Sequence, residues 1–594
     1  MNKLSSIEDF RRLKDEILET QSKNNNKKQV KVHQGTCGIS SGADETLSAF
    51  NKLCEEKGLL SDIIVSRASC IGHCGKEPIV TVIDPRLGKV IYQSITAEKV
   101  DRIIQEHLMN DRVVDEWKMD TSTPRFQMQE IRILHNQDID PFDINEYIGR
   151  DGYQALTRVI SSMEPEEVLS EIKNAGLRGR GGAGFPTATK WGFVRNSKSD
   201  EKYVVCNGDE GDPGAYMNRA VLEGNPHSII EGMMIGAYAI GNVRKGYVYV
   251  RAEYPLAIQT LQNAIDQAKE YGLLGPNILG TGFSFDLEIF PGAGAFVCGE
   301  ETALLISIEG KRGSPRQRPP FPSDQGLFGK PTTLNNVETW SNVPLIIQHG
   351  AEWFRSTGSE TSKGTKLLCL VGKVKNPGLI EIPLGTTLGE IIYDLGEGIQ
   401  DDKKFKAVQL GGPSGGVIPA DCLNTPVDYD SIPALGAIMG SGGMVVMDED
   451  SCMVDVARYF LEFTKEESCG QCIACREGTS QLYDVLCKIT QGKGTLEHLD
   501  LLEDLSDLVK AASMCGLGQT APNPVLTTLR YFRDEYEKHI IDKHCPAAVC
   551  QSLFRAPCEH SCPAGINVPG YVALIKEGKY EDACSLIMQK LPFP

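Results

Sequence analysis

Three glycine-rich blocks hold the residues of this sequence with the clearest chemical meaning. They read LRGRGGAGFPTATKWGF at 177–193, KYVVCNGDEGDPGAYMNR at 202–219 and GAGAFVCGEETAL at 292–304. Because glycine has no Cβ, the backbone N–H groups of such loops can come close to a phosphate or a flat ring. Lysines, an asparagine, carboxylates and aromatic residues accompany the glycines. This mixture predicts a site for a flat, phosphorylated redox cofactor with a second nucleotide lying over it.

Single residues in these blocks have predictable roles. Lys190 follows the first glycine-rich loop on an expected helix and can supply a positive charge. Asn207, Asp209 and Glu210 follow a buried-looking strand, at the place where polar groups collect in α/β folds. One such loop could be an ordinary tight turn at the start of a helix, but three blocks over about 130 residues favour a cofactor site.

A tight run of cysteines predicts a second redox centre. Cys469, Cys472 and Cys475 are each separated by two residues, and Cys515 follows about forty residues later. This spacing is typical of a [4Fe–4S] cluster, although four cysteines also bind zinc. A cluster here would take single electrons and so divide a two-electron transfer into one-electron steps.

The C-terminal cysteines suggest a structural metal site. Four amphipathic helices are expected at 452–464, 476–490, 497–512 and 523–541. In an up-down-up-down bundle the start of the first helix and the end of the fourth lie at the same end, which places Cys452 near His539, Cys545 and Cys550. Three thiolates and one imidazole form a closed zinc set, so we predict zinc at these residues. Unliganded residues are the alternative.

Composition limits the classes of protein that this sequence can represent. The chain has 594 residues, a net charge of −18 and 19 cysteines. The length predicts several domains, and the negative charge argues against nucleic acid as a partner. No apolar run is long enough for a membrane span, and the charged N-terminus lacks a signal-peptide core. We therefore expect a cytoplasmic protein whose cysteines bind metal rather than form disulfides.

The patterns of apolar residues divide the chain into parts and predict an α/β multidomain protein. Helices and strands alternate around the glycine-rich blocks, and a β-rich segment containing one helix, at 388–396, precedes the bundle. One helix at 97–108 is expected to close the N-terminal α/β domain, and a single helix is expected at 573–590 in the tail. Other cysteines, such as Cys54, Cys369, Cys422, Cys487 and Cys584, are expected to be buried small hydrophobic residues. The predicted parts are an N-terminal helix and linker (1–29), an α/β domain (30–112), the cofactor domain (140–345), a β-rich domain (365–440), the helical bundle (445–541) and a Cys-rich helical tail (542–594).

From about residue 147 to residue 519 the sequence resembles the NADH-oxidising, FMN-binding flavoprotein subunit of complex I and of soluble NAD-linked hydrogenases and formate dehydrogenases. The resemblance rests on the three blocks, on PRQRPPFPSDQGLFGKPTTLNNVET and on ESCGQCIACREG. It implies a Rossmann-like FMN/NADH domain, a soluble-ligand-binding β-grasp domain at 365–440 and a four-helix bundle with the [4Fe–4S] cluster. It implies that FMN is held by Gly179, Arg180, Gly181, Lys190, Asn207, Asp209, Glu210, Gly299, Glu300, Asn335 and Asn336.

The same resemblance implies an NAD(H) site over the flavin. Aromatic rings would surround the nucleotide, and three polar side chains would contact it, with Glu301 nearest to the reacting rings. Asp212 stands where the respiratory subunits have a glutamate. Hydride transfer needs two rings face to face and no acid–base pair at the reacting carbon, so no side chain is predicted to be catalytic. The implied NAD(H) contacts are Phe185, Phe193, Phe321, Glu301, Asp212 and Arg318.

The N-terminal domain resembles thioredoxin-like [2Fe–2S] ferredoxins through VHQGTCGISSGA and SRASCIGHCGKEPIV. Cys70 and Cys74 match one pair of ligands, but only Cys37 is present in the other half. The fourth ligand could be His33, Ser41 or Cys54, or the domain could lack a cluster and only pack against a partner. We favour a [2Fe–2S] cluster on Cys37, Cys70 and Cys74.

The tail, CEHSCPAGINVPGYVALIKEGKYEDACSLIMQKLPFP, resembles the cluster-binding N-terminal region of glutamate synthase small subunits and of transhydrogenase flavoproteins. Cys558 and Cys562 have few nearby partners, so the tail could dock a partner, share a cluster with it, or add His560 to the zinc set. Together these features look most like the flavoprotein subunit of soluble electron-bifurcating hydrogenase or transhydrogenase complexes. The expected partners are other iron–sulfur and flavoprotein subunits and ferredoxin, with NADP or protons as the third couple. A non-bifurcating NADH dehydrogenase (diaphorase) subunit is the rival prediction.

Overall fold

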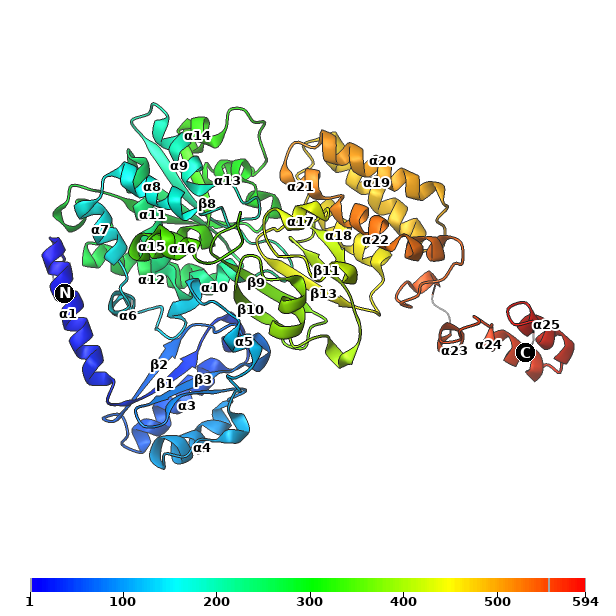
Figure 1. Cartoon of the computed structure of the whole chain (residues 1–594), viewed down its shortest axis with the longest axis horizontal. Coiled ribbons are helices and arrows are strands. Elements are labelled where there is room, and N and C mark those ends of the chain that lie inside the picture. Colours follow the sequence, from blue (N-terminus) through cyan, green and yellow to red (C-terminus); the bar gives the residue numbers. More distant parts are fainter. Residues whose placement is uncertain (1–2, 554–555, 593–594) are drawn as a thin grey trace. The chain divides into compact units, whose positions relative to one another are not determined.

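The computed structural model describes residues 3–553 and 556–592, and it divides into two compact units (Figure 1). Unit 1 comprises residues 1–402, 409–412 and 421–446. Unit 2 comprises residues 403–408, 413–420 and 447–594. The structure is of the mixed α/β, multidomain kind that the sequence predicts.

Unit 1 begins with an amphipathic helix, α1 (Ile7–Asn24), which buries Phe10, Leu13 and Ile17 on one face. A four-stranded sheet of order β2-β1-β3-β4 follows. Its strands are β1 (Lys28–His33), β2 (Ile63–Ala68), β3 (Val80–Asp84) and β4 (Gly88–Tyr92), accompanied by the helices α2 (Thr36–Ser40), α3 (Ala43–Glu56) and α4 (Val100–Ile103). The continuous helix expected over 97–108 is instead a 3₁₀ turn, α4 and a π-helical segment at Ile104–Met109.

The middle of unit 1 contains a four-stranded parallel sheet of order β7-β6-β5-β8. The strands are β5 (Lys202–Gly208), β6 (Val243–Arg251), β7 (Asp286–Gly292) and β8 (Thr332–Asn336). The helices of this part of the chain are α5 (Pro124–Gln127), α6 (Ile144–Gly149), α7 (Gln154–Ser162), α8 (Pro165–Ala175), α9 (Thr187–Asn196), α10 (Met217–Gly224), α11 (Pro226–Ile240), α12 (Pro255–Tyr271), α13 (Glu301–Ile308), α14 (Pro322–Gln325), α15 (Val337–His349) and α16 (Ala351–Arg355).

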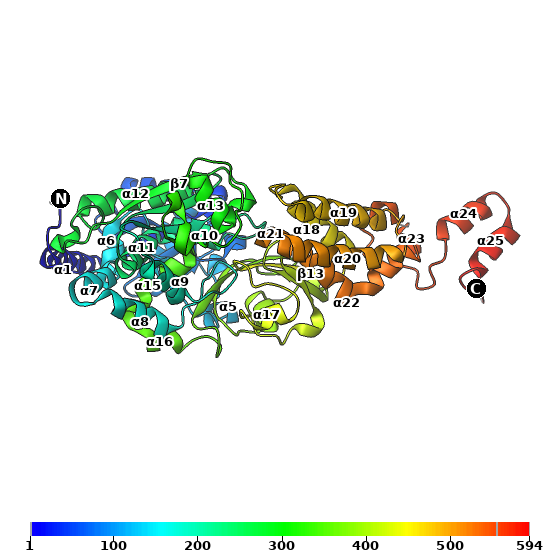
Figure 2. The ribbon, with the colours of Figure 1, turned by 90° about the horizontal axis from the view of Figure 1, so that it is seen from above.

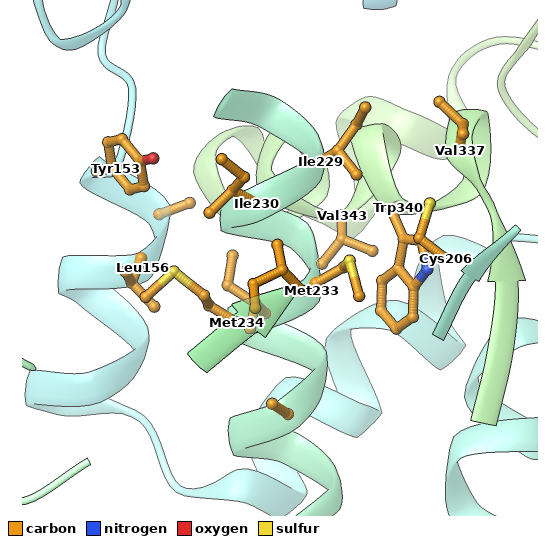
Figure 3. Close-up of a cluster of buried hydrophobic side chains, with 14 of the residues drawn as sticks. Tyr153, Leu156, Cys206, Ile229, Ile230, Met233, Met234, Val337, Trp340 and Val343 are labelled. Carbon is orange, nitrogen blue, oxygen red and sulfur yellow. The ribbon is translucent and has the colours of Figure 1, made fainter. Parts of the chain in front are cut away.

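Helix α11 lies at the centre of the core in unit 1. Its residues are apolar on nearly every side, which is typical of a helix with no solvent-facing side, and almost all of them are buried. Figure 3 shows Met233 and Met234 of α11 between Leu156 of α7 and Trp340 of α15. This packing fixes α15, the helix that follows β8, against the sheet.

A second, mainly β domain follows α16. Its five-stranded sheet has the order β10-β9-β13-β11-β12. The strands are β9 (Thr365–Gly372), β10 (Gly378–Pro383), β11 (Phe405–Leu410), β12 (Gly416–Pro419) and β13 (Gly443–Asp448), with one short helix, α17 (Ser431–Ala434). The sheet therefore extends beyond the boundary at residue 440 that the sequence predicts. The helix expected near residues 388–396 is a π-helical segment, Glu390–Leu395.

The main part of unit 2 is the predicted bundle of four long helices, which lie side by side in Figures 1 and 2. They are α18 (Met453–Glu466), α19 (Ile473–Thr490), α20 (Glu497–Ala512) and α22 (Asn523–Ile540), with the short α21 (Gly516–Thr520) between the last two. The single tail helix that we expected is wrong. A break at Gly578, whose φ is +75°, separates α24 (Val568–Lys576) from α25 (Tyr580–Met588), and α23 (Pro557–His560) precedes them.

Candidate flavin and metal sites

The polar residues of the predicted flavin site gather at the carboxyl edge of the parallel sheet in unit 1. β5 and β8 are parallel neighbours, and Cys206 and Asn207 pair with Asn335 and Asn336. Parallel strands end at the same edge of a sheet, so the CNGDE and LNN segments meet there. Asn335 is further fixed because its side-chain oxygen accepts the indole N–H of Trp191 at 3.1 Å.

The third glycine-rich block reaches the same edge. Asn207 donates from its side chain to the carbonyl of Gly299 at 3.0 Å. A Cβ on Gly299 would lie 3.6 Å from an Asp209 carboxylate oxygen, and a Cβ on Gly181 would lie 3.3 Å from the Cβ of Asn336. The Gly181 contact is tight and the Gly299 contact is an ordinary van der Waals distance, so the first block lies against β8 and the third against Asp209. Glycines at these places let a flat group approach the backbone.

Two helices begin at this edge, α13 and α15. The carboxylate of Glu300 accepts the N–H groups of Thr302 and Ala303, and the side chain of Asn336 accepts that of Glu338. Helix N-termini attract anions, and here two of them flank the glycine-rich blocks. Although Glu300 and Asn336 already bind the first N–H groups, the positive ends of the two helix dipoles suit a phosphorylated flavin.

The loop Leu177–Pro186 is held in a hairpin-like turn that requires glycine. The Gly179 N–H donates to the carbonyl of Phe185 at 2.8 Å and closes the loop. Gly184 has a φ of +62°, and a Cβ there would lie 2.6 Å from the ring of Tyr429. Any other residue at position 184 would be strained in both backbone conformation and space.

Lys190, Glu301 and Arg318 form a charged triad within the site. Lys190 Nζ lies 2.8 Å from one carboxylate oxygen of Glu301, and Arg318 Nη1 lies 3.0 Å from the other. Burial acts to raise the pKa of Glu301, but the two cations outweigh it and hold this pKa below its usual value. The carboxylate is therefore ionised and positioned between two cations that the sequence alone does not place together.

The three predicted aromatic contacts of the nucleotide are exposed. Phe185, Phe193 and Phe321 are each about half accessible to solvent, and the rings of Phe185 and Phe193 have centroids 6.4 Å apart. Large exposed apolar side chains of this kind are suited to bind a ligand ring. Their contact with NAD(H) stays a prediction.

Three other predicted contacts are engaged within the protein. Arg180 is fully buried, and its guanidinium donates to the carbonyls of Arg178, Lys363 and Thr365. Its side chain therefore joins the loop to β9, and its contact with FMN stays a prediction. Glu210 accepts the N–H groups that start α10, from Asn218 and Arg219.

Asp212 is the third of these contacts. Its carboxylate oxygen Oδ2 accepts a hydrogen bond from the Ser441 hydroxyl at 3.1 Å. Burial raises the pKa of Asp212 to about 7. Ionised nucleotide contacts usually keep a low pKa, so the carboxyl of Asp212 is better suited to hold the β-rich domain against the CNGDE block. Its contact with NAD(H) stays a prediction.

A three-thiol site lies in the N-terminal domain of unit 1. The Cys74 thiol is in hydrogen-bonding contact with the thiols of Cys37 and Cys70. Cys37 lies in the first turn of α2, and Cys74 begins the turn that follows Cys70. The structure thus brings together the three cysteines that the ferredoxin resemblance selects.

The candidates for a fourth ligand at this three-thiol site differ in their availability. Cys54 lies on the buried side of α3, in the hydrophobic core, and both ring nitrogens of His33 are engaged, by Ser69 and Thr81. Ser41 caps the end of α2. Sequence reasoning missed Glu77, whose buried Oε1 has no hydrogen-bond partner in the described part of the chain and whose other oxygen packs near Gly38.

The [4Fe–4S] motif lies in unit 2 at the start of α19. Cys472 is the residue before the first turn of α19, Cys475 is buried in that turn, and Cys515 precedes α21. Burial raises the pKa of Cys475 to about 11, and the thiols of Cys472, Cys515 and Cys469 add to this effect. These four thiols are therefore near neighbours, as the spacing predicts.

Cys452, His539, Cys545 and Cys550 form a compact group in unit 2. Their ligand atoms all lie within 4.8 Å of one another, and all four residues are buried. His539 Nε2 lies 3.4 Å from Cys452 Sγ and 3.3 Å from Cys550 Sγ. Its Nδ1 lies 2.7 Å from the carbonyl of Glu535, which orients the ring and leaves Nε2 toward the thiols. This is the arrangement of a closed, four-coordinate metal site.

Comparison with protein families matches the parts of the chain to known domains. Residues 172–345 match the Nuo51 FMN-binding domain, and residues 455–539 match the NADH-ubiquinone oxidoreductase-F iron–sulfur binding region. Residues 367–418 match the SLBB domain, and residues 530–594 match the dihydropyrimidine dehydrogenase domain II with a 4Fe–4S cluster. Fold and site together define an NAD(H)-dependent FMN oxidoreductase with a [4Fe–4S] domain.

Proteins of similar sequence show to which family of these oxidoreductases the chain belongs. The chain is 58% identical over 415 residues to HndC, a subunit of the NADP-reducing hydrogenase of Solidesulfovibrio fructosivorans, covering 70% of this chain and 84% of HndC. It is 44% identical over 420 residues to the F 2 component of the NADH-quinone oxidoreductase of Rhizobium meliloti, covering 70% of this chain and 100% of that protein. The chain therefore belongs to the family of NADH-dehydrogenase-type flavoprotein subunits that occur in complex I and in NAD- or NADP-reducing hydrogenases.

A solved structure is similar to most of the chain. It is a NAD+-reducing [NiFe]-hydrogenase in the H2-reduced state, with 31% identity and a TM-score of 0.63 over 86% of this chain and 84% of that chain. Within the part of the chain that the structure describes, no helix has the length and apolar character needed to cross a membrane.

Proposed function

We propose that the chain is the flavoprotein subunit of a soluble, cytoplasmic electron-bifurcating complex. Hydride is exchanged between NAD(H) and FMN, and electrons leave singly through iron–sulfur clusters to ferredoxin and to a third couple, NADP or protons. The observation that carries this proposal is the three-thiol site, which adds a second candidate one-electron centre to the flavin domain within unit 1. The match of residues 530–594 to a 4Fe–4S domain supports further electron partners.

In this proposal the residues at the sheet edge bind and orient the two ring systems. Bound FMN supplies the chemistry that converts a hydride into single electrons. The glycine backbone of the blocks provides N–H donors for the ring edge, and the positive ends of the α13 and α15 dipoles, together with Lys190, favour the phosphate. The exposed Phe185 and Phe193 cover a nicotinamide ring and limit the access of water. The carboxylate of Glu301, held in place by Lys190 and Arg318, accepts hydrogen bonds from hydroxyl groups of the nucleotide.

We assign the clusters by their thiols. Cys469, Cys472, Cys475 and Cys515 hold a [4Fe–4S] cluster, and Cys37, Cys70 and Cys74 hold a [2Fe–2S] cluster in a thioredoxin-like domain. The buried Cys475 and Cys515 and the contact between the three N-terminal thiols support this assignment. Glu77 is the fourth ligand that best suits the second site, because one of its buried oxygens has no partner in the described chain.

The compact group of Cys452, His539, Cys545 and Cys550 holds a structural zinc ion in this proposal. Three thiols and one imidazole with a fixed tautomer leave no open position for a substrate. The site joins the first and last helices of the bundle, α18 and α22, to the segment that leads into the tail. Residues 542–594 then serve as a zinc hinge and a docking segment for another subunit. The side chain of His560 lies outside the described residues.

Replacing Cys550 with serine is expected to remove one zinc ion per chain, because a structural zinc site needs all four ligands. Metal analysis of the purified chain, with iron measured in the same sample, tests this. The matched control is Cys584→Ser, an exposed cysteine of the same tail, which should leave the zinc content unchanged. Unchanged zinc in Cys550→Ser would refute the assignment.

A plain NADH dehydrogenase subunit of a hydrogenase or formate dehydrogenase is the second candidate. The similarity to a NAD+-reducing [NiFe]-hydrogenase favours it. In that function the chain passes electrons to one acceptor, and the tail only docks a partner.

The two candidates differ in how ferredoxin is reduced. For the whole purified complex we expect ferredoxin reduction by H2 or NADPH only when NAD+ is supplied as the higher-potential acceptor, because bifurcation sends one electron of each pair to ferredoxin and the other to NAD+. The measurement is ferredoxin reduction followed by absorbance, with and without that acceptor. Equal rates in both conditions would remove bifurcation and leave the simple dehydrogenase.

A further inference from the structure

One face of helix α10 lies against the three-thiol site of the N-terminal domain. Tyr216, immediately before α10, and Arg219 and Glu223 within it are spaced three and four residues apart, which places them on one side of the helix. α10 belongs to the flavin domain, since the N–H groups of Asn218 and Arg219 at its start donate to Glu210 of the CNGDE block. The helix therefore contacts the predicted flavin site at its start and the thiols along its side.

Two of these residues contact cysteine sulfurs. Nη2 of Arg219 donates to Cys37 Sγ at 3.8 Å, and the protonated Cys74 thiol donates to the hydroxyl of Tyr216 at 3.5 Å. A Cys74 thiolate bound to iron has no proton to give, so the Tyr216 hydroxyl would then be the donor. The ring of Tyr216 is held in place from above by the Arg219 guanidinium, 5.2 Å from the ring centroid. Both contacts are within the range of weak hydrogen bonds to sulfur, and both come from outside the domain that carries the thiols.

Glu223 holds the start of α2, which carries Cys37, in position. Its carboxylate accepts the backbone N–H of Thr36 at 3.0 Å and also the Thr36 hydroxyl. Thr36 precedes Cys37, so the first turn of α2 is attached to α10. Glu223 also lies 3.7 Å from Arg219, which offsets part of its negative charge.

A second cation approaches the thiols from the other side. Arg125 is fully buried and donates to the carbonyl of Gly72, between Cys70 and Cys74, at 3.0 Å. Its other bonds are to the carbonyls of Asn376 and Leu395, so no carboxylate neutralises it in these contacts.

Hydrogen bonds to cluster sulfurs and positive charge near a cluster stabilise its reduced form. Reduction adds one negative charge to an iron–sulfur cluster, and the reduction potential depends on net charge, on hydrogen bonds to the sulfurs and on solvent exposure. In a buried site these effects are weakly screened. Tyr216, Arg219 and Arg125 all act in this direction. Glu223, which pairs with Arg219 and accepts from Thr36, acts in the opposite direction and offsets part of the effect of Arg219.

We propose that α10 raises the reduction potential of the iron–sulfur site in the N-terminal domain, through the hydroxyl of Tyr216 and the guanidinium of Arg219. This inference rests on the proposed [2Fe–2S] cluster and deepens it, because it gives that cluster the role of the higher-potential acceptor. Tyr216 and Arg219 are positioning residues, since they act on the cluster through its cysteine ligands. The N-terminal domain alone would lack both donors and would have a lower potential.

The test is a potentiometric titration of the full chain, followed by EPR, for the native protein, Tyr216→Phe and Tyr238→Phe. We expect Tyr216→Phe to move the midpoint potential of the [2Fe–2S] signal to more negative values. The [4Fe–4S] midpoint in the same samples should not move, because that cluster is bound by other cysteines. Tyr238→Phe is the matched control. It also removes one tyrosine hydroxyl, but the hydroxyl of Tyr238 donates to the backbone carbonyl of Met163 and not to a thiol.

The outcomes distinguish the effect of α10 on the potential from the existence of the [2Fe–2S] cluster itself. A [2Fe–2S] midpoint that is the same in Tyr216→Phe and in the native protein overturns the role of α10 and leaves the cluster intact. Absence of any [2Fe–2S] signal in an intact, anaerobic native sample overturns the cluster and this inference with it. Arg219→Lys keeps the charge but changes the geometry, so it should give a smaller negative shift than the more disruptive Arg219→Met.

Discussion

Replacing Cys515 with serine is expected to abolish the [4Fe–4S] cluster and stop electron exit through unit 2. Cys515 is buried and precedes α21, about forty residues from the other three cysteines, so no neighbouring thiol can replace it. The loss should amount to about four iron atoms per chain. The rate of electron transfer from NADH through the complex should also fall. Loss of a residue that only supports a metal ligand costs roughly 10–100-fold, and loss of a ligand itself should cost more.

Iron analysis, EPR and two activity assays check this expectation. NADH oxidation with an acceptor that takes electrons directly from the flavin should persist, because the three glycine-rich blocks are untouched. Transfer to ferredoxin by the whole complex should be lost. Cys487→Ser on α19 is the matched control, since Cys487 belongs to none of the predicted ligand sets and its replacement should leave iron unchanged. Full iron content in Cys515→Ser would show that Cys515 is not a ligand.

Replacing Lys366 with methionine is expected to destabilise unit 1 by about 3–5 kcal/mol, the cost of breaking a buried ion pair. Lys366 and Glu338 are both fully buried, and Lys366 Nζ donates to the carboxylate of Glu338. Without Lys366 this carboxylate keeps the Leu367 N–H, at 2.9 Å, and the more distant Arg180, at 4.0 Å. A buried charge then loses its closest partner.

The same pair lies beside the flavin site, so the variant should also bind FMN more weakly. Glu338 is in the first turn of α15, two residues after Asn336, and Lys366 is on β9 of the next domain. Urea unfolding followed by tryptophan fluorescence measures the stability, and flavin content after gel filtration measures the binding. Lys375→Met is the control, because its ion pair with Asp402 is exposed and solvent screens such pairs, so the stability should change little.

A double variant separates the pair from the packing. Lys366→Met combined with Glu338→Leu removes both charges, so it should recover part of the stability that the single variant loses. Recovery should be incomplete because the Leu367 N–H then lacks its acceptor. A single variant as stable as the native protein would contradict the expectation that this buried pair holds β9 to α15.

The cofactor motifs could be predicted from the sequence because their chemistry is local. Glycines at 179, 181 and 184 and the cysteines at 469, 472 and 475 are close in sequence, and backbone approach or metal ligation depends on that spacing. Strand β5 and helix α11 could be predicted for a related reason, since continuous apolar residues indicate buried elements. The zinc residues followed from bundle topology, and the structure places their ligand atoms within 4.8 Å.

Other elements could not be predicted because competing effects decided them. The expected tail helix is split because Gly578 adopts a left-handed conformation that ends α24. The surroundings of the Arg180 side chain could not be predicted either, because its guanidinium donates to three backbone carbonyls of the adjoining segments. A glycine-rich loop indicates that the backbone approaches a ligand. It does not predict the direction or the partners of a long side chain in the same loop.

The sequence by itself determined which groups this protein can hold, namely a flavin with a nucleotide and clusters on closely spaced cysteines. Only the tertiary structure decided how those groups are surrounded. Tyr216 and Arg219 meet the thiols of residues 142 and 182 positions earlier, and Glu223 meets Thr36 across 187 positions. Such contacts leave no periodic pattern in a single sequence, because they arise where two separately folded domains pack together. The tuning of a redox site by its neighbours is therefore a property of the assembled fold.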